Sequence, residues 1–319
     1  MNKWKSLNSM IVHELRLLLR SKWLLNFTIL FFAMAALFYF YGLKSIETDP
    51  VEVTYGLESV GTDIDIGTVD PSYFGLEETV VEGEGGGGAA DSSVGYNRAI
   101  SMLMNLSLWI IPIIALILGA NSIIADKEGG RLALYRTYQM PYIFYLLSKF
   151  IALSLSLIIS LGISYGVVGV GISLFGEPME NSFLMTFLLL NVFLVILFSA
   201  LSLIIGSISV TRMQGLSLAL FAWSLLVFVY EFVIFSVIDL VPYAQKLNSV
   251  LVMVLLNPIE SIRVWSIEKL NADYIFGPEF LIISEWGASG MLTNIILITF
   301  ALMIVIAILV SNQVMKWRG

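Results

Sequence analysis

Residues 183–210 read FLMTFLLLNVFLVILFSALSLIIGSISV, a stretch without a single charged side chain. About 20 consecutive apolar residues are enough for a helix to cross the hydrocarbon core of a bilayer. A helix also satisfies its backbone hydrogen bonds internally, which the bilayer demands of any segment that crosses it. This stretch therefore predicts a transmembrane helix, and it sets the standard for the other apolar runs of the chain.

Other runs of similar length and composition flank this one, so we expect an all-α polytopic membrane protein with six transmembrane helices. The predicted spans are residues 23–43, 99–125, 149–175, 182–210, 215–241 and 291–311. Pro112 lies inside the second span and predicts a kink there. The 319 residues are 58% hydrophobic and 13% charged, with a mean hydropathy of +0.89, whereas soluble domains are about 45–50% apolar.

Composition also argues against several kinds of site. The chain has no cysteine, which removes disulfides, thiolate ligands and thiol nucleophiles, and His13 is its single histidine. It has no phosphate-binding G-x-x-x-x-G-K-[ST] motif. Met102 and Met104 point to different faces of a helix, so we interpret them as packing residues rather than copper ligands. We therefore expect no catalytic residue, no metal and no cofactor in this chain, and no enzyme activity of its own.

Basic residues distinguish the two sides of the membrane. One side collects Lys3, Lys5, Arg16, Arg20, Lys22, Lys127, Arg131, Arg136, Lys149, Arg212, Lys316 and Arg318. The other side carries Lys44, Arg98, Lys246, Arg263 and Lys269. The positive-inside rule assigns the first set to the cytoplasm, so both termini are expected there, including the tail at residues 312–319.

The segment 1–22 is predicted to be an amphipathic helix at the cytoplasmic membrane surface. One predicted face is apolar and consists of Ile11, Val12, Leu15, Leu18 and Leu19. His13, Arg16 and Arg20 lie on the other face, where they can meet lipid phosphates. The alternative is an ordinary lead-in to the first span.

Two segments are expected outside the cell. Residues 44–98 form an acidic loop that has no Lys or Arg from Glu47 to Asp91. Its composition favours weak order, although residues 51–55 and 64–69 could pair as a hairpin, and the loop could also dock a partner or collect cations.

The second outer segment, residues 242–290, shows stronger local signals. Residues 247–256 are apolar but too few to span, so a re-entrant or interfacial piece is expected. Asn257 can cap a following helix, with Pro258 at its first position and Glu260 at its third. This outer segment is therefore expected to be structured.

Polar residues inside the predicted spans are candidates for lining a path across the membrane. Glu231 lies well inside the fifth span, and an intramembrane carboxylate is a functional candidate. The alternative is a protonated glutamate bonded to a polar residue of a neighbouring helix, such as Asn191 or Asn105. Asn121 is a further candidate for the path.

The cytoplasmic loop at residues 126–148 carries the most informative motif, DKEGGRLALYRTYQMP at residues 126–141. Its two glycines should break the preceding helix, and Pro141 should end a short helix of about ten residues. Lys149 then marks the return to the bilayer. A short helix with mixed aromatic and basic residues suits docking to a soluble partner, with a plain surface turn as the alternative.

The stretch from Ala125 to Ile151 resembles the ABC-2 type of ABC-transporter permease. In that family an acidic-Gly-Gly segment leads into a Leu-rich coupling helix, followed by a proline and by a lysine that opens the third span. The residues that match are Glu128, Gly129, Gly130, Leu132, Leu134, Thr137, Tyr138, Pro141 and Lys149. The order of features along the whole chain agrees with the family as well.

The resemblance implies the ABC-2 (type V exporter-like) fold in a bacterial cytoplasmic membrane. It implies a homodimer of permeases that works with a separate cytoplasmic ABC ATPase, and this ATPase would bind ATP and Mg. Nucleic acid is not expected as a partner. The residues it assigns to ATPase coupling are Glu128, Gly129, Gly130, Arg131, Leu132, Leu134, Tyr135, Tyr138 and Pro141.

Within the family, residues 129–149 and 255–263 are most similar to permeases of nitrous-oxide-reductase maturation. Arg131 departs from that pattern, because a small hydroxyl residue is usual there. The likeness implies a sulfur- or copper-related cargo and an outer accessory protein that docks on Asn257, Pro258, Glu260 and Arg263. The alternatives are an ABC-2 exporter of a peptide, lipid or drug, and an ion-coupled carrier that works without ATP.

Overall fold

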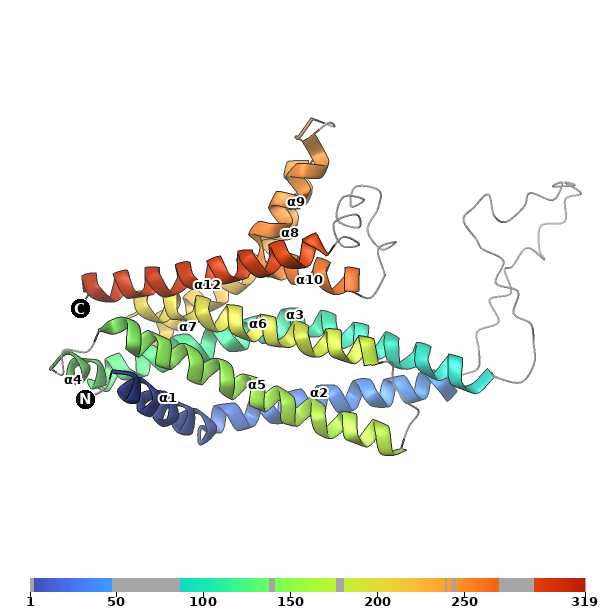
Figure 1. Cartoon of the computed structure of the whole chain (residues 1–319), viewed down its shortest axis with the longest axis horizontal. Helices are drawn as coiled ribbons and strands as arrows, with labels where there is room; N and C mark the ends of the chain where they lie inside the picture. The colour runs from blue at the N-terminus through green and yellow to red at the C-terminus, as the bar shows by residue number, and fades with distance from the viewer. Residues whose placement is uncertain are drawn as a thin grey trace, which may run out of the picture.

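The structure is a computed structural model that describes residues 3–47, 87–137, 141–175, 181–238, 240–242, 245–269 and 290–318. Within these ranges the long elements are all helical. Most of the acidic loop, with the predicted hairpin at residues 51–55 and 64–69, lies outside the described residues. The long helices run beside one another, and both termini and the short helix α4 lie at the same end of the bundle (Figure 1).

The elements follow one another along the chain as one series of helices. They are α1 (Lys3–Leu19), α2 (Lys22–Glu47), α3 (Gly87–Glu128), α4 (Arg131–Thr137), α5 (Tyr142–Phe175), α6 (Asn181–Ile208), α7 (Arg212–Ser224), the π-helix η2 (Leu225–Val229), α8 (Tyr230–Ile238), α9 (Lys246–Leu256), α10 (Pro258–Lys269) and α12 (Met291–Arg318).

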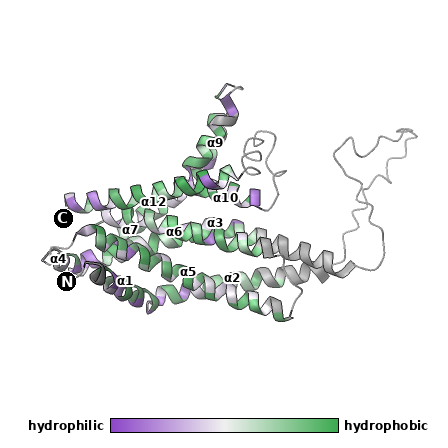
Figure 2. Cartoon of the chain, in the orientation of Figure 1, coloured by the Kyte–Doolittle hydropathy of each residue, from purple (hydrophilic) through white to green (hydrophobic). Residues whose placement is uncertain are grey.

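Five helical stretches are long and apolar enough to cross a membrane. They are Met102–Glu128, Tyr142–Gly171, Leu184–Ile208, Arg212–Ile234 and Met291–Trp317. Two bent pairs also qualify when each is taken as one span: Leu7–Leu19 with Lys22–Leu37, bent by 64°, and Ser249–Leu256 with Pro258–Lys269, bent by 111°. Apolar residues cover the middle of the bundle, whereas polar residues gather at the end that carries the termini (Figure 2). The all-helical membrane fold is thus confirmed. The number of six spans stays a prediction; it requires that α2 crosses the membrane and that the pair α9–α10 turns back without crossing.

Several predicted boundaries differ from the observed helices. Helix α3 begins at Gly87, inside the predicted acidic loop at residues 44–98, and α12 continues to Arg318, through the predicted tail at residues 312–319. The third span was expected to start at Lys149, but α5 already begins at Tyr142, directly after Pro141, whose carbonyl accepts from the Phe144 N–H at 3.0 Å. The fifth span was expected to be one continuous helix, but it contains the π-helical turn η2 between α7 and α8.

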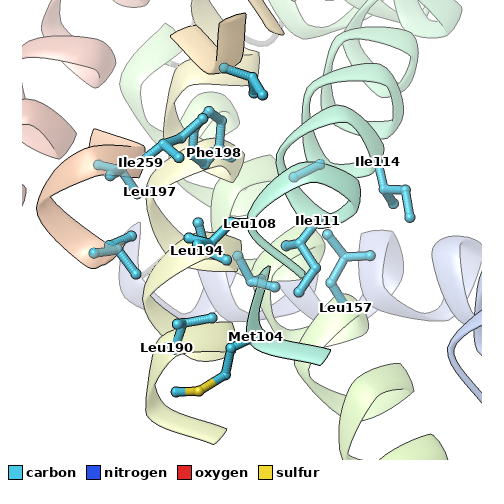
Figure 3. Close-up of a cluster of buried hydrophobic side chains, with 14 of the residues drawn as sticks. Met104, Leu108, Ile111, Ile114, Leu157, Leu190, Leu194, Leu197, Phe198 and Ile259 are labelled. Atoms are coloured by element: carbon cyan, nitrogen blue, oxygen red, sulfur yellow. The ribbon is translucent and has the colours of Figure 1, made fainter. Parts of the chain in front are cut away.

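The core lies between α3 and α6. The apolar windows of these two helices are each 61% buried, against 11% for the stretch through α7 and α8 and 17% for α12. Leu108 and Ile111 of α3 meet Leu194 and Phe198 of α6 in this core (Figure 3). Met104 is buried in the same cluster, as expected of a packing residue.

Close approach of α3 and α6 depends on a small residue at position 119. A Cβ atom added at Gly119 would collide with the Ser202 side chain and would lie 2.7 Å from Leu153 Cδ2. Any larger side chain at this position must therefore push α3 away from α6 or displace α5. Small residues at such positions are typical of closely packed membrane helices.

Pro112 interrupts the backbone ladder of α3, because it has no N–H to donate. Near this break the indole Nε1–H of Trp223, on α7, donates to the carbonyl of Trp109 at 2.8 Å. The carbonyl left without its partner by Pro112 is that of Leu108, so the indole bond ties α7 to α3 one residue further along rather than replacing the lost bond.

Candidate functional site

The two glycines of the cytoplasmic motif break the helix where the sequence predicts it. Helix α3 ends at Glu128, and the N–H groups of Gly129 and Gly130 bond back to the carbonyls of Ala125 and Lys127 at 3.0 and 3.2 Å. Gly130 has φ 70°, a conformation that L-residues with a Cβ rarely adopt. Helix α4 follows at once and runs from Arg131 to Thr137, seven residues rather than the expected length of about ten; residues 138–140, before Pro141, lie outside the described residues.

Helix α4 rests on the bundle through its apolar side. Leu132 is buried in a second apolar cluster with Ile123, Tyr145, Leu146, Leu203 and Met315. The ring of Tyr135 packs on the ring of Tyr145 with centroids 5.3 Å apart. Burial, followed by the carboxylates of Glu14 and Asp126, raises the pKa of the Tyr135 hydroxyl, which therefore stays neutral.

A buried charge network lies directly beside α4. The Nζ of Lys149 in α5 lies 2.6 Å from Glu14 Oε2 in α1 and 2.7 Å from Asp126 Oδ2 in α3. The Tyr145 hydroxyl donates to Asp126 Oδ2 at 2.9 Å. Arg131, the first residue of α4, places its Nε 3.1 Å from Asp126 Oδ1 as an ion pair. Four helices therefore converge on one set of charges.

This network is electrically balanced only when α4 is in place. Glu14, Asp126 and Lys149 are all at most 4% exposed, and together they carry one net negative charge. The missing positive charge comes from Arg131, whose side chain is 51% exposed. Removing a buried charge from water is costly unless it is paired, so displacement of α4 would leave an uncompensated carboxylate.

The residues after Asp126 connect the end of α3 to two further helices. Lys127 Nζ donates to the carbonyls of Gly206, Ser207 and Ser209 at 2.8, 2.7 and 2.8 Å, at the C-terminal end of α6. A cation at this position also meets the negative end of the helix dipole. Glu128 Oε2 pairs with Arg212 Nε at 2.7 Å, at the start of α7. The consecutive side chains of Asp126, Lys127 and Glu128 thus bind α5, α6 and α7, respectively.

The predicted coupling residues divide into two groups. Leu132 and Tyr135 pack on neighbouring helices and position α4, whereas Glu128 is exposed and ties the end of α3 to Arg212 of α7. Arg131 and Pro141 are exposed, as are Gly129 and Gly130. The side chain of Leu134 and the whole of Tyr138 lie outside the described residues.

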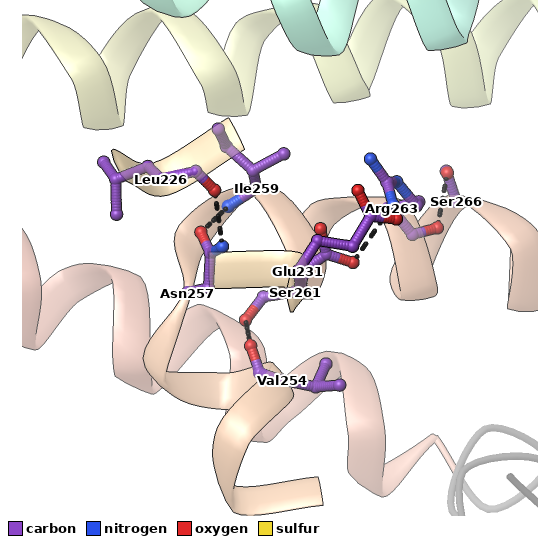
Figure 4. Close-up of polar contacts among 9 residues, drawn as sticks. Leu226, Glu231, Val254, Asn257, Ile259, Ser261, Arg263 and Ser266 are labelled. Atoms are coloured by element: carbon purple, nitrogen blue, oxygen red, sulfur yellow. Dashed lines mark hydrogen bonds and ion pairs between the residues drawn. The ribbon is translucent and has the colours of Figure 1, made fainter. Parts of the chain in front are cut away.

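The cap predicted at Asn257 is confirmed, and it lies inside the protein. Asn257 Oδ1 accepts from the Ile259 N–H at 3.0 Å, and its Nδ2 donates to the Leu226 carbonyl in η2 at 2.8 Å (Figure 4). Ser261 Oγ donates to the Val254 carbonyl at 2.9 Å and ties α10 to α9. Asn257, Pro258 and Glu260 are all buried, so within this chain they hold α10 in place.

Glu231 has a different partner from the one suggested by sequence. Its Oε1 lies 3.3 Å from Nη1 of Arg263, which is also 3.3 Å from Glu260 Oε2 (Figure 4). The Asn191 amide donates to the Phe187 carbonyl of its own helix at 2.6 Å. The carboxylate of α8 is therefore held by an arginine of α10.

The other candidate path residues have different exposures. Asn105 is exposed, Asn121 is half-buried with its Oδ1 buried and unbonded, and Asn191 is buried. Within the described residues, no three His, Cys, Asp or Glu side chains come together to hold a metal ion.

The sequence gives little warning of the charge network, because its members lie far apart along the chain. Asp126 and Lys149 belong to the loop motif and its flank, whereas nothing along the sequence marks Glu14 as their partner. The one local signal is that Glu14 falls among leucines of a basic helix, where an acid is out of keeping with lipid phosphates.

The apolar bundle, the bent pair α1–α2 and the anchored helix α4 define a multi-pass α-helical membrane protein. The chain belongs to the ABC-2 family, since the family model described as ABC-2 family transporter protein matches residues 9–314. It is therefore a permease subunit of an ABC transporter, a multi-pass protein of the bacterial plasma membrane, and its family implies a partner ATPase subunit.

Two relatives share the description "Probable ABC transporter permease protein NosY". The protein of Stutzerimonas stutzeri is 29% identical over 187 residues, which cover 56% of this chain and 67% of that protein. The protein of Pseudomonas aeruginosa is 25% identical over 193 residues, which cover 58% of this chain and 70% of that protein.

Proposed function

We propose that α4 is the docking element for the cytoplasmic ATPase and that two copies of this chain form the transporter with two ATPase subunits. ATP and Mg would bind to the ATPase alone. Closure of the ATPase pair would move α4, and the helices attached to it would open a path across the membrane.

The observation that carries this proposal is the buried charge network of Glu14, Asp126, Lys149 and Arg131. Its buried ion pairs join α1, α3 and α5 through contacts that are costly to break in a low-dielectric interior. Arg131 attaches α4 to this network through Asp126. A displacement of α4 is therefore transmitted to a membrane-surface helix and to two spans. An ordinary surface turn would need no such attachment.

Site-directed crosslinking tests the docking surface. Because the chain has no cysteine of its own, each introduced cysteine is its single thiol. A Thr137→Cys variant carries one thiol at the exposed end of α4. A Gln313→Cys variant carries one on α12, exposed at the same end of the bundle. In native membranes we expect a crosslink to the ATPase from position 137 and a much weaker one from 313. Equal crosslinks, or none from 137 while the ATPase co-purifies, contradict docking on α4.

We further propose that the cargo is a sulfur- or copper-related species used in nitrous-oxide-reductase maturation. The names of the two relatives and the stretch around Asn257 support this choice. The path would be lined by Asn105, Asn121, Asn191 and Glu231, and an outer accessory protein would dock near α10. Deletion of the gene should lower the copper content of the reductase; a normal copper content excludes this cargo.

The long acidic segment between α2 and α3 supports a second candidate, an ABC-2 exporter of a peptide, lipid or drug. That loop is larger than the nitrous-oxide likeness leads us to expect. An ion-coupled carrier is the third candidate, and it differs in its source of energy. Its transport would be driven by a proton or sodium gradient and would need no ATPase. Transport by vesicles that contain ATP but no ion gradient separates the ABC mechanisms from the carrier.

A further inference from the structure

Helix α1 has three faces rather than the two that its sequence suggests. One face lies against the bundle and contains Leu7, Glu14 and Leu18, of which Leu7 and Glu14 are buried. Val12 and Leu19 remain 46% and 45% exposed. Because Leu18 and Glu14 turn inward, they do not belong to the surface that α1 presents outward.

The outward surface divides into an apolar and a basic strip. A helical residue advances by about 100°, so Leu15, Leu19 and Val12 fall within about 60° of one another. His13, Arg16 and Arg20 fall within a neighbouring arc of about 60°, and all three are exposed. An apolar strip beside a basic strip is the pattern of a helix lying in the plane of a membrane surface.

The same surface continues across the bend into α2. The two helices meet at 64°, and Lys22 and Trp23 at the start of α2 are exposed. Tryptophan is enriched at membrane–water interfaces, where its apolar ring and polar N–H are both satisfied. We call the exposed residues His13, Arg16, Arg20 and Lys22 the basic elbow.

The basic elbow has no carboxylate to neutralise it within its own helices. Residues 3–47 contain two acids, Glu14 and Glu47. Glu14 is turned into the bundle and is bound by Lys149 at 2.6 Å. Glu47 lies at the opposite end of α2. The one acid that could screen this surface is therefore used inside the protein.

We propose that the basic elbow binds the headgroups of anionic phospholipids at the cytoplasmic membrane surface. The three fixed cations attract a lipid with net negative charge, whereas a zwitterionic lipid offers its phosphate together with a compensating cation. The apolar strip of α1 would lie at the acyl boundary and hold the basic strip at headgroup depth. This proposal rests on the membrane location and is independent of the docking of an ATPase on α4.

Bromolipid quenching of the full-length chain in liposomes tests the proposal. A Ser9→Cys variant labelled with bimane reports on the exposed basic side of α1. Quenching is compared between brominated phosphatidylglycerol and brominated phosphatidylcholine at equal mole fractions, which gives a relative binding constant. We expect phosphatidylglycerol to be preferred, and the preference to fall as salt is raised.

The decisive variant is Arg16→Gln with Arg20→Gln. Near an anionic surface each basic residue contributes roughly fivefold in binding, so the double variant should lose most of the preference. Arg16→Lys with Arg20→Lys should retain it. Lys316→Gln, which removes an exposed cation from α12, is the matched control and should not change it.

Two results would overturn the proposal. The first is equal quenching by the two lipids in the parent protein. The second is an unchanged preference in the Arg16→Gln, Arg20→Gln variant; if that variant also loses the ATPase on purification, the basic elbow binds an acidic protein surface instead. The crosslink from Thr137→Cys separates these results from a failure of docking on α4.

Discussion

Lys149→Met is the substitution that most severely tests the buried charge network. Methionine keeps a long flexible side chain but removes the charge that lies 2.6 Å from Glu14 and 2.7 Å from Asp126. Both carboxylates would remain buried, with only the half-exposed Arg131 near one of them. Removal of one member of a buried ion pair typically costs about 3–5 kcal/mol, so we expect a loss of this size in unfolding free energy.

A charge-free variant provides the matched control for Lys149→Met. Combining it with Glu14→Gln and Asp126→Asn leaves no buried charge to desolvate. Replacing a whole buried ion pair is often close to neutral, so the triple variant should recover at least about 2 kcal/mol relative to Lys149→Met. Unfolding by SDS in mixed micelles, followed by intrinsic fluorescence, measures both values. A cost below about 1 kcal/mol for Lys149→Met, typical of an exposed pair, would refute the network.

Gly119→Ala should destabilise the chain by about 1–3 kcal/mol in the same unfolding assay, because its Cβ collides with α6. Gly162→Ala has open space and gains helix propensity, so it should not destabilise; an equal loss there would show that the Gly119 effect is not a collision. Asn257→Ala should cost about 1–3 kcal/mol, and Asn257→Asp at least as much, because aspartate keeps the cap acceptor but buries a carboxylate against the Leu226 carbonyl oxygen. Glu231→Gln should lower ATP-dependent transport; full transport would show that Glu231 serves only to hold Arg263.

The features that the sequence predicted well are those with local signals. Runs of apolar residues predicted the helices, and the pair Gly129–Gly130 predicted the break before α4. Asn257 followed by proline predicted the start of α10. In each case the signal and the structure it specifies lie within a few residues of each other, so no tertiary contact is needed.

The features that were missed depend on contacts between distant residues. Lys149 was expected at the membrane surface, because an isolated lysine beside an apolar run avoids the interior. Its burial requires Glu14, which lies on another helix. The π-helical turn η2 was missed for a related reason: its Leu226 carbonyl receives a donor from Asn257, a residue of the outer segment. Sequence patterns of a single helix do not contain this information.

The claim that a separate ATPase drives this permease through α4 is tested most directly by affinity purification from native membranes. The full chain is compared with a Leu134→Asp variant in α4 and with Gln313→Asp at the same end of α12. We predict that an ABC ATPase co-purifies with the parent chain and with Gln313→Asp, and is lost from Leu134→Asp. Absence of an ATPase from the parent chain, or its retention by Leu134→Asp, would contradict the account.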